Sequence, residues 1–358
     1  EFLRRSGELP APAVEGLTLA FPDDEAANEL DYTRAVSEHL GVPIREVTPT
    51  LVPISWYQER AQADLEFPGY PNGAMSIGLR QEARKGGAKA IVSGVGGDEW
   101  LGDFSSLRAY YAEELQLRRL RSWFRLLRTD LAEIGGTQTM RCLLRAVVLA
   151  RLPAGARRAI SRSWSRLNKR DAAPFELLSA DLRRLLDERR ASEVGPGPRG
   201  RRMQQTARLM TLVDPYSAWA VESEERMAAR AGLELRHPLR DAALVQFAFS
   251  LPARFIVRGR TNKYMHRRAM VDILPRRVLE RHTKAEFSVV MRHQLADAAP
   301  VLARVAGGSS PWIDVGQLEH LYRRYAEGLP IGRDVCTGTA QWLLSGFIGC
   351  DALISLGR

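Results

Sequence analysis

One short segment constrains the fold of this chain more than any other. Residues 90–104 read Ala-Ile-Val-Ser-Gly-Val-Gly-Gly-Asp-Glu-Trp-Leu-Gly-Asp-Phe, an apolar run that ends in glycines and two adjacent carboxylates. The apolar run predicts a buried β-strand. Gly94, Gly96 and Gly97 then let the backbone turn sharply and approach a bound group. The segment predicts a strand that leads into a ligand loop or, in the plainer interpretation, an ordinary turn before a capped helix.

The same turn is suited to phosphate and magnesium. Asp98 and Glu99 stand where a new helix would begin. Backbone N–H groups at such a turn suit phosphate oxygens, and an aspartate there suits a magnesium ion that accompanies those phosphates. The segment therefore favours a phosphorylated ligand if the turn binds one at all.

The first hundred residues alternate between strand and helix patterns. Strand patterns cover 17–21, 43–48 and 88–93, and helix patterns cover 31–40 and 74–85. This β-α-β-α-β order predicts an α/β fold, with a parallel sheet, helices on both of its faces and ligand loops at the carboxyl ends of its strands.

Helical patterns dominate the rest of the chain. We therefore divide it into an α/β part, residues 1–107, and a large, mainly helical part, residues 108–358. The Gly- and Pro-rich segment 194–200 predicts a loop that splits the helical part in two.

Composition argues against several classes of protein. No apolar stretch approaches the roughly twenty residues that cross a bilayer, and the first residues lack a signal-peptide pattern. We expect no membrane partner and a cytoplasmic location. Cys142, Cys336 and Cys350 lack C-x-x-C spacing, which argues against a disulfide framework and a zinc site.

The chain is basic, with a formal net charge of +10. Much of the excess lies at 118–128 and 157–170, where Arg alternates with apolar residues as on an amphipathic helix. Such helices present a solvated face or a docking surface for an acidic peptide or a carrier protein. Polyanion binding is the alternative, but no nucleic-acid-binding motif supports it, so we expect no nucleic-acid partner.

A second group of charged residues lies in the helical half, at 234–241. Its sequence is Glu-Leu-Arg-His-Pro-Leu-Arg-Asp. Pro238 breaks the chain, so that Arg236 and Asp241 can pair or face a cleft. In the alternative interpretation, Glu234 and these two residues only fix a loop between helices.

A third group follows at 262–288. Lys263, Arg267 and Met270 have the spacing of one helical face. Cations projected from a helix start can meet a polyphosphate, or they can belong to a solvated basic helix.

In this order the segments resemble the synthetase domain of the asparagine synthetase family over nearly the whole chain. The resemblance assigns residues 1–358 to a fragment of that domain, with residues 1–107 as its nucleotide-binding part. The family motifs S-G-x-G-(S/G)-D-E, E-x-R-x-P-(F/L)-x-D, K-(Y/H)-x-L-R and K-x-x-F-S are matched in turn by 93–99, 234–241, 263–267 and 284–288. The resemblance implies the adenine-nucleotide alpha-hydrolase-like fold of the PP-loop ATPases.

The family's pyrophosphate loop, S-G-G-x-D-S, lies about thirty residues before the position of Leu17, and this chain starts later. We therefore expect a domain that is missing its first strand and belongs to a longer protein. A glutamine-hydrolysing domain, the source of ammonia in this family, would lie further upstream.

The resemblance implies ATP-dependent activation of a carboxylate. The carboxylate attacks the α-phosphate of ATP, giving an acyl adenylate and pyrophosphate, and an amine then displaces AMP to leave an amide. Charge builds on the leaving pyrophosphate, so magnesium and fixed cations matter more than a nucleophile.

Matching the family motifs to this sequence implies a role for each matched residue. Asp98 would hold Mg²⁺, Lys263 would stabilise the leaving phosphates, and Glu234 and Arg236 would orient the acyl substrate or the amine. The nucleotide would contact the following residues: Ala20, Ser93, Gly94, Gly96, Gly97 and Asp98.

Three positions depart from the family pattern. Val95 stands where asparagine-forming members carry a glutamate near the amino-acid substrate, and a valine can neither hold an ammonium group nor exchange a proton. Phe104 replaces a tyrosine, and His266 occupies the leucine position of its motif. Aspartate is therefore in doubt as the substrate, and a different small-molecule or peptide carboxylate is expected.

Two alternatives stay open. One is an intramolecular amide-forming cyclase, similar to the lasso-peptide cyclases or the β-lactam synthetases. The other is a noncatalytic scaffold relative, which the retained Asp98 and Lys263 oppose.

Overall fold

The computed structural model describes most of the chain. The described residues are 2–65, 72–101, 111, 113–115, 117–144, 178–193, 203–252, 255–256, 258–259, 261–296, 299–306 and 313–327. The loop expected at 194–200, the basic segment at 157–170 and Phe104 lie outside them. Among the described helices, none is long and apolar enough to cross a membrane.

Four strands form two parallel pairs. β1 (Gly16–Leu19) pairs with β2 (Ile44–Val47), and β3 (Ala90–Val92) pairs with β4 (Glu234–Arg236). The three strands expected from the sequence are present, each shorter than its pattern. β4 was not foreseen, because three residues are too few to show a strand period. The part expected to be mainly helical therefore contributes a strand to the sheet region.

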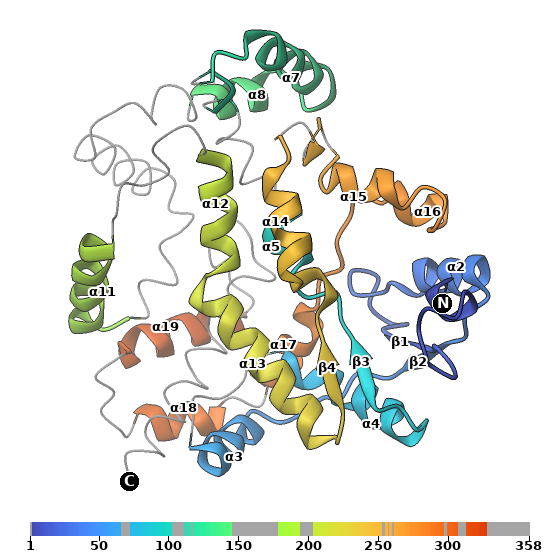
Figure 1. Cartoon of the computed structure of the whole chain (residues 1–358). Helices are drawn as coiled ribbons and strands as arrows, with labels where there is room; N and C mark the ends of the chain where they lie inside the picture. The colour runs from blue at the N-terminus through green and yellow to red at the C-terminus, as the bar shows by residue number, and fades with distance from the viewer. Residues whose placement is uncertain are drawn as a thin grey trace.

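Helices make up the rest of the described structure (Figure 1). In the N-terminal part these are α1 (Phe2–Arg5), α2 (Leu30–Leu40), α3 (Ser55–Asp64), the 3₁₀ helix η1 (Gly73–Ser76), α4 (Ile77–Lys85) and α5 (Gly97–Trp100). Beyond them lie α7 (Leu120–Glu133), α8 (Gly136–Leu143), α11 (Ala180–Glu193), α12 (Met203–Leu212), α13 (Pro215–Arg230), η5 (Pro238–Arg240) and α14 (Ala242–Ser250). The last are α15 (Tyr264–Ala269), α16 (Arg276–Leu279), α17 (Ser288–Ala296), α18 (Ala299–Ala306) and α19 (Val315–Ala326).

Local sequence explains several helix ends. α2 ends where the sequence predicts, because Gly41 adopts the left-handed conformation with φ 61°. α13 begins after Asp214, whose carboxylate accepts a hydrogen bond from the backbone N–H of Tyr216, and Pro215 stands in the first turn. α13 is thereby directed alongside β4, as Figure 1 shows.

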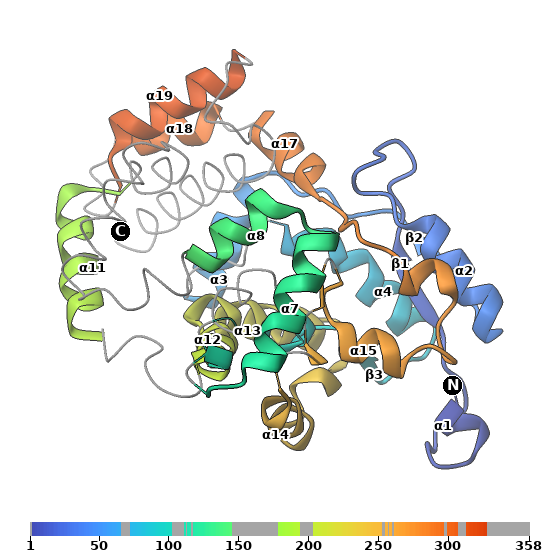
Figure 2. The same cartoon turned by 90° about the horizontal axis from the view of Figure 1, so that it is seen from above.

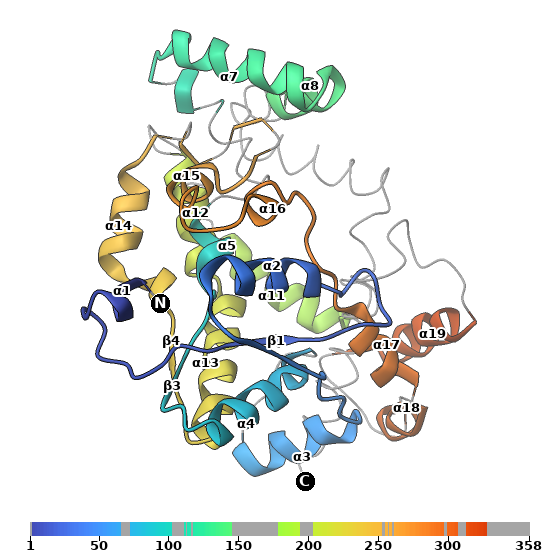
Figure 3. The same cartoon turned by 90° about the vertical axis from the view of Figure 1, so that its right-hand side faces the viewer.

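One apolar cluster joins the two strand pairs. Ala83 of α4, Ala228 of α13 and the neighbouring Leu233 are buried together, and the strand residues Leu17 and Ile91 pack against them. Figure 3 shows β1 between α2 and α4, both of which contact it, and α13 contacts β4. The two pairs thus share a core, although no described hydrogen-bonded ladder links β1 to β3.

The opposite face of β3 and β4 is open. Val92 is 68% exposed, and the side chains of Glu234 and Arg236 on the neighbouring strand are exposed as well. Strands of a parallel sheet normally have both faces covered. In the described part of the chain, the expected cover of helices on both faces is therefore found on only one face of this pair.

The remaining helices surround this centre. α18 and α19 lie on the far side of the molecule from α14 (Figure 2), and α16 contacts α2. α16 is fixed to α2 by an ion pair from Arg277 to Asp31 and by Arg281, whose guanidinium lies 4.2 Å from the ring centre of Tyr32. These contacts hold the segment on both sides of α16 close to the carboxyl ends of the strands.

Candidate functional site

The pairing of β3 with β4 brings two loops together. Val92 is opposite Arg236 in the parallel register, and the backbone N–H of Ser93 donates to the carbonyl of Arg236 at 3.0 Å. The glycine loop 93–97 therefore leaves the sheet directly beside the loop 237–241. Trp100, 1% exposed, reinforces this contact because its indole N–H donates to the carbonyl oxygen of Leu239 at 2.5 Å.

The glycines of this loop have different structural roles. Gly96 has φ 106°, and a Cβ atom there would lie 2.6 Å from Cγ of Arg240. Only glycine fits such a conformation and such a contact. Gly94 has nothing within 4 Å of the position a Cβ would take. Gly96 therefore packs the two loops together, whereas Gly94 leaves room for a ligand beside the backbone.

Asp98 is bonded to two lysines. Its Oδ1 accepts from Nζ of Lys263 at 2.5 Å, and its Oδ2 accepts from Nζ of Lys284 at 2.7 Å. Burial raises the pKa of the Asp98 carboxyl, but the hydrogen bonds from the two lysines outweigh burial and lower the pKa to about 2. The carboxylate stays ionised at any physiological pH, as a metal ligand must.

Lys263 is held in place by its own loop. It precedes α15 as the cap residue, with φ 52°, and does not lie on a helical face with Arg267 and Met270 as expected. Left-handed conformations are uncommon outside glycine and persist only where the surroundings fix them. Here Arg267 donates to the carbonyl of Asn262 at 3.0 Å and to that of Leu279 at 2.6 Å.

Lys284 reaches Asp98 from a segment anchored to the end of β1. Phe287 packs on Phe21 with ring centroids 5.5 Å apart, and the N–H of Glu286 donates to the carbonyl of Ala26 at 2.9 Å. Ala20 directly precedes Phe21, and its N–H still donates to Val47 of β2. The segment thus connects the carboxyl end of β1 to the loop after β3. Our site predictions omitted Lys284, although the K-x-x-F-S motif contains it.

Glu234 and Arg236 lie apart from this cluster. Both are exposed on β4 and form a two-point hydrogen-bonded ion pair with each other, at 2.9 Å for each bond. No described contact joins either residue to Asp98 or Lys263. Glu234 starts β4 opposite Ala90, at the far end of the strand from the ligand loops, so the described contacts do not bring it together with Asp98 and Lys263.

Asp241 also has a structural role. Its carboxylate accepts from the N–H of Leu244 at 2.9 Å and caps α14. Of the alternatives that the sequence left open, a pair between Asp241 and Arg236 is not formed, because each residue has a closer local partner.

The side chains of Asp98, Lys263 and Lys284 fit a magnesium–polyphosphate ligand. Asp98 supplies hard carboxylate oxygens, and Mg²⁺ is commonly bound by one or two carboxylates together with substrate phosphates and water. Lys263 and Lys284 supply cations for phosphate oxygens. The described residues contain no cluster of three or more His, Cys, Asp or Glu side chains that could hold a metal by themselves. Within the described part of the chain, a metal at Asp98 would take its other ligands from phosphates and water.

Comparison with known proteins gives the family. The family model for asparagine synthase matches residues 5–344, almost the whole chain. The chain belongs to the asparagine synthase family. Among curated proteins, none matches it. In this asparagine synthase family member, the match includes both loops and both lysines, and it agrees with the resemblance found in the sequence.

Two glycine substitutions should separate packing from binding. We expect Gly96→Ala to lower the melting temperature by several degrees, because its Cβ would strike Arg240 in a backbone conformation that alanine disfavours. Gly94→Ala should leave the melting temperature within about 1 °C of wild type, since the added methyl meets open space. Thermal unfolding followed by circular dichroism measures both. Equal destabilisation by the two substitutions would contradict the assignment.

Proposed function

We propose that the chain is the synthetase part of an ATP-dependent amide-forming ligase that activates a carboxylate as an acyl adenylate. Membership of the asparagine synthase family supports ligase activity with ATP. The observation that carries the proposal is the convergence of Asp98 with Lys263 and Lys284, which lie more than 160 residues further along the chain, at the carboxyl end of β3. Three charged groups so placed suit a magnesium nucleotide better than they suit a solvated surface.

The proposed reaction divides into two steps. An oxygen of the substrate carboxylate attacks the α-phosphorus of ATP, and the bond to the β-phosphate breaks to release pyrophosphate. Lys263 and Lys284 then face the negative charge that grows on the leaving group. Asp98 would exchange its lysine partners for Mg²⁺, which when bound neutralises phosphate charge. In the second step an amine attacks the acyl carbon, and AMP leaves with the electron pair of the broken C–O bond.

The open sheet edges support the PP-loop arrangement with a missing strand. Among the described strands, β1 pairs only with β2 and β3 only with β4, so each has one unpaired edge. Exposed strand edges present unpaired backbone donors and acceptors. A strand from a preceding segment, followed by the pyrophosphate loop, would satisfy these edges. Such a strand would also deliver backbone N–H groups toward the phosphates beside Asp98.

Val95 limits which carboxylates can be the substrate. It lies in the ligand loop and offers neither a charge nor a hydrogen-bonding side chain to an amino-acid substrate. We propose a small-molecule or peptide carboxylate other than aspartate. The amine is either ammonia from an upstream glutaminase domain or an amine within the same substrate, as in a cyclase.

The first prediction concerns pyrophosphate release. With ATP, Mg²⁺ and a panel of carboxylic acids, we expect release from the full-length protein but not from residues 1–358 alone. The isolated chain lacks the backbone cradle for the β- and γ-phosphates, and losing it should cost roughly a thousandfold in rate.

In the full-length protein, Asp98→Ala should abolish release and leave the fold intact. Asp272→Ala, at an exposed turn, is the matched control and should keep wild-type activity. An active isolated chain, or a fully active Asp98→Ala protein, would contradict the mechanism.

A second prediction concerns Lys284. Lys284→Ala should lower kcat/KM for ATP by roughly a hundredfold, as removal of one charge-stabilising donor typically does. Lys85→Ala, also an exposed lysine but on α4, should leave kcat/KM unchanged. Steady-state kinetics on the active full-length protein measures both, and equal values for the two variants would exclude Lys284 from the site.

A further inference from the structure

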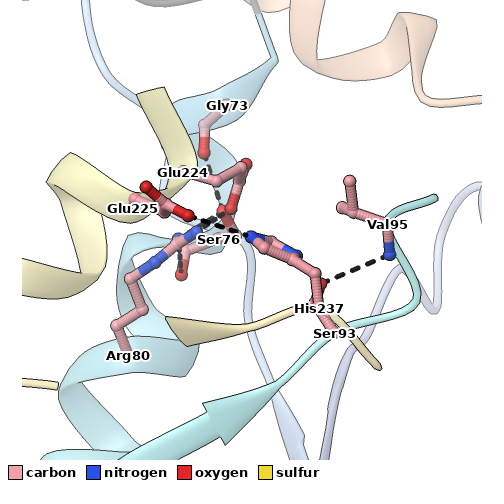
Figure 4. Close-up of polar contacts among 8 residues, drawn as sticks. All are labelled: Gly73, Ser76, Arg80, Ser93, Val95, Glu224, Glu225 and His237. Atoms are coloured by element: carbon pink, nitrogen blue, oxygen red, sulfur yellow. Dashed lines mark hydrogen bonds and ion pairs between the residues drawn. The ribbon is translucent and has the colours of Figure 1, made fainter. Parts of the chain in front are cut away.

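A serine, a histidine and a glutamate form a chain of contacts beside the ligand loop. Oγ of Ser93 lies 2.6 Å from Nδ1 of His237, and Nε2 of His237 lies 3.7 Å from Oε1 of Glu225 on α13. Figure 4 shows the imidazole lying between the serine and the glutamate. Ser93 follows β3 and His237 follows β4, so the register of the two strands fixes the first contact.

The partners of the Ser93 hydroxyl determine which of its hydrogen bonds it donates and which it accepts. The backbone N–H of Val95 donates to Oγ of Ser93 at 3.3 Å, so this oxygen already accepts one bond. A carboxylate facing Nε2 favours the tautomer with the proton on Nε2, which leaves Nδ1 as an acceptor. The hydroxyl proton of Ser93 is then committed to His237, and one acceptor position on Oγ remains. Phosphate oxygens cannot fill it, because they too are acceptors, whereas an amine N–H can.

The surroundings keep His237 neutral at rest. Its side chain is only 8% exposed, and burial lowers its pKa below the usual value. Glu225 acts in the opposite direction, Arg240 lowers the pKa further, and Glu99 raises it. Among the described residues, none forms a hydrogen bond with Nε2 within 3.5 Å.

The neighbouring carboxylate, that of Glu224, does not compete with Glu225 for contact with His237. Glu224 accepts an ion-pair hydrogen bond from Arg80, which also donates to the hydroxyl of Ser76 at 2.6 Å (Figure 4). Glu225 is therefore the carboxylate of this helix that faces His237. It is 54% exposed and can adjust to the charge of the imidazole.

We propose that Ser93, His237 and Glu225 form a relay that takes up the proton lost by the amine in the amide-forming step. The C–N bond forms as the C–O bond to the phosphate of AMP breaks, and AMP keeps that electron pair. The amine N–H proton passes to Oγ of Ser93 while the hydroxyl proton passes to Nδ1 of His237. The resulting imidazolium faces the carboxylate of Glu225. Ser93 touches the reacting amine, and His237 and Glu225 are positioning residues behind it.

The relay rests on the proposed function and supplies the proton acceptor that the amide-forming step requires. Val95 cannot exchange a proton, so its side chain supplies no proton acceptor in the ligand loop. His237, two residues before the turn at Leu239, supplies an acceptor to the same loop from the neighbouring strand. The substrate class that fits is an amine that reaches Ser93 as a hydrogen-bond donor.

The first test needs no substrate. Nitrogen-15 NMR of the histidines in the chain should show His237 with the proton on Nε2. Glu225→Gln should lower the pKa of His237 further, because the carboxylate that stabilises the imidazolium is gone. Glu222→Gln, an exposed glutamate on the same helix, should not change it. A proton on Nδ1 in wild type, or equal titrations in wild type and Glu225→Gln, would overturn the relay.

The second test separates the two half-reactions in the full-length protein. Using a carboxylate found by pyrophosphate release, we expect His237→Asn to keep ATP–pyrophosphate exchange within about threefold, since asparagine can still bond Ser93. Amide formation should fall roughly a hundredfold, the usual scale of lost proton transfer, and recover partly as pH rises. Equal loss in both half-reactions, or loss in neither, would overturn the proposal. Absence of exchange in wild type would instead refute the proposed function, and the relay's role with it.

Discussion

The parallel pairing of β3 with β4 is the constraint on which the candidate site depends. It joins segments 144 residues apart in sequence and places Ser93 beside His237 at the carboxyl ends of the two strands. Gly96 then lets the two loops approach each other within van der Waals contact of Arg240. The direction of Asp98 follows from that packing, because α5 starts immediately after Gly96 and Trp100 fixes the other end of the helix to Leu239.

Electrostatics at Asp98 explain how a stable fold can still exchange ligands. The carboxylate satisfies its oxygens with two lysines, yet Lys284 is 84% exposed and Lys263 is partly exposed. Ion pairs in contact with water contribute only about 0–1 kcal/mol each to stability. A magnesium nucleotide that offers phosphates to the lysines and a metal to the carboxylate can therefore replace these pairs at little cost. The positions of the charges are fixed mainly by the backbone, through Arg267 and Phe287.

The sequence predicted the local part of this architecture well and its long-range part less well. The glycine loop, the helix that ends at Gly41 and the match to the family could be recognised, because each depends on short patterns or on their order. β4 could not, since its three residues acquire strand character only by pairing with β3. Glu234 and Arg236 pair with each other along β4, and His237 meets Ser93 only across the strand pair, so no local pattern shows these contacts. Lys284, by contrast, stands in a motif that the sequence does show.

The central claim is that Asp98 and the two lysines form a magnesium–polyphosphate site. A crystal structure of the full-length protein with Mg²⁺ and a non-hydrolysable ATP analogue tests it most directly. The account predicts the metal on Asp98, phosphate oxygens on Lys263 and Lys284, and no remaining bond between Asp98 and either lysine. A nucleotide bound elsewhere, with the bonds from Asp98 to both lysines intact, would contradict it.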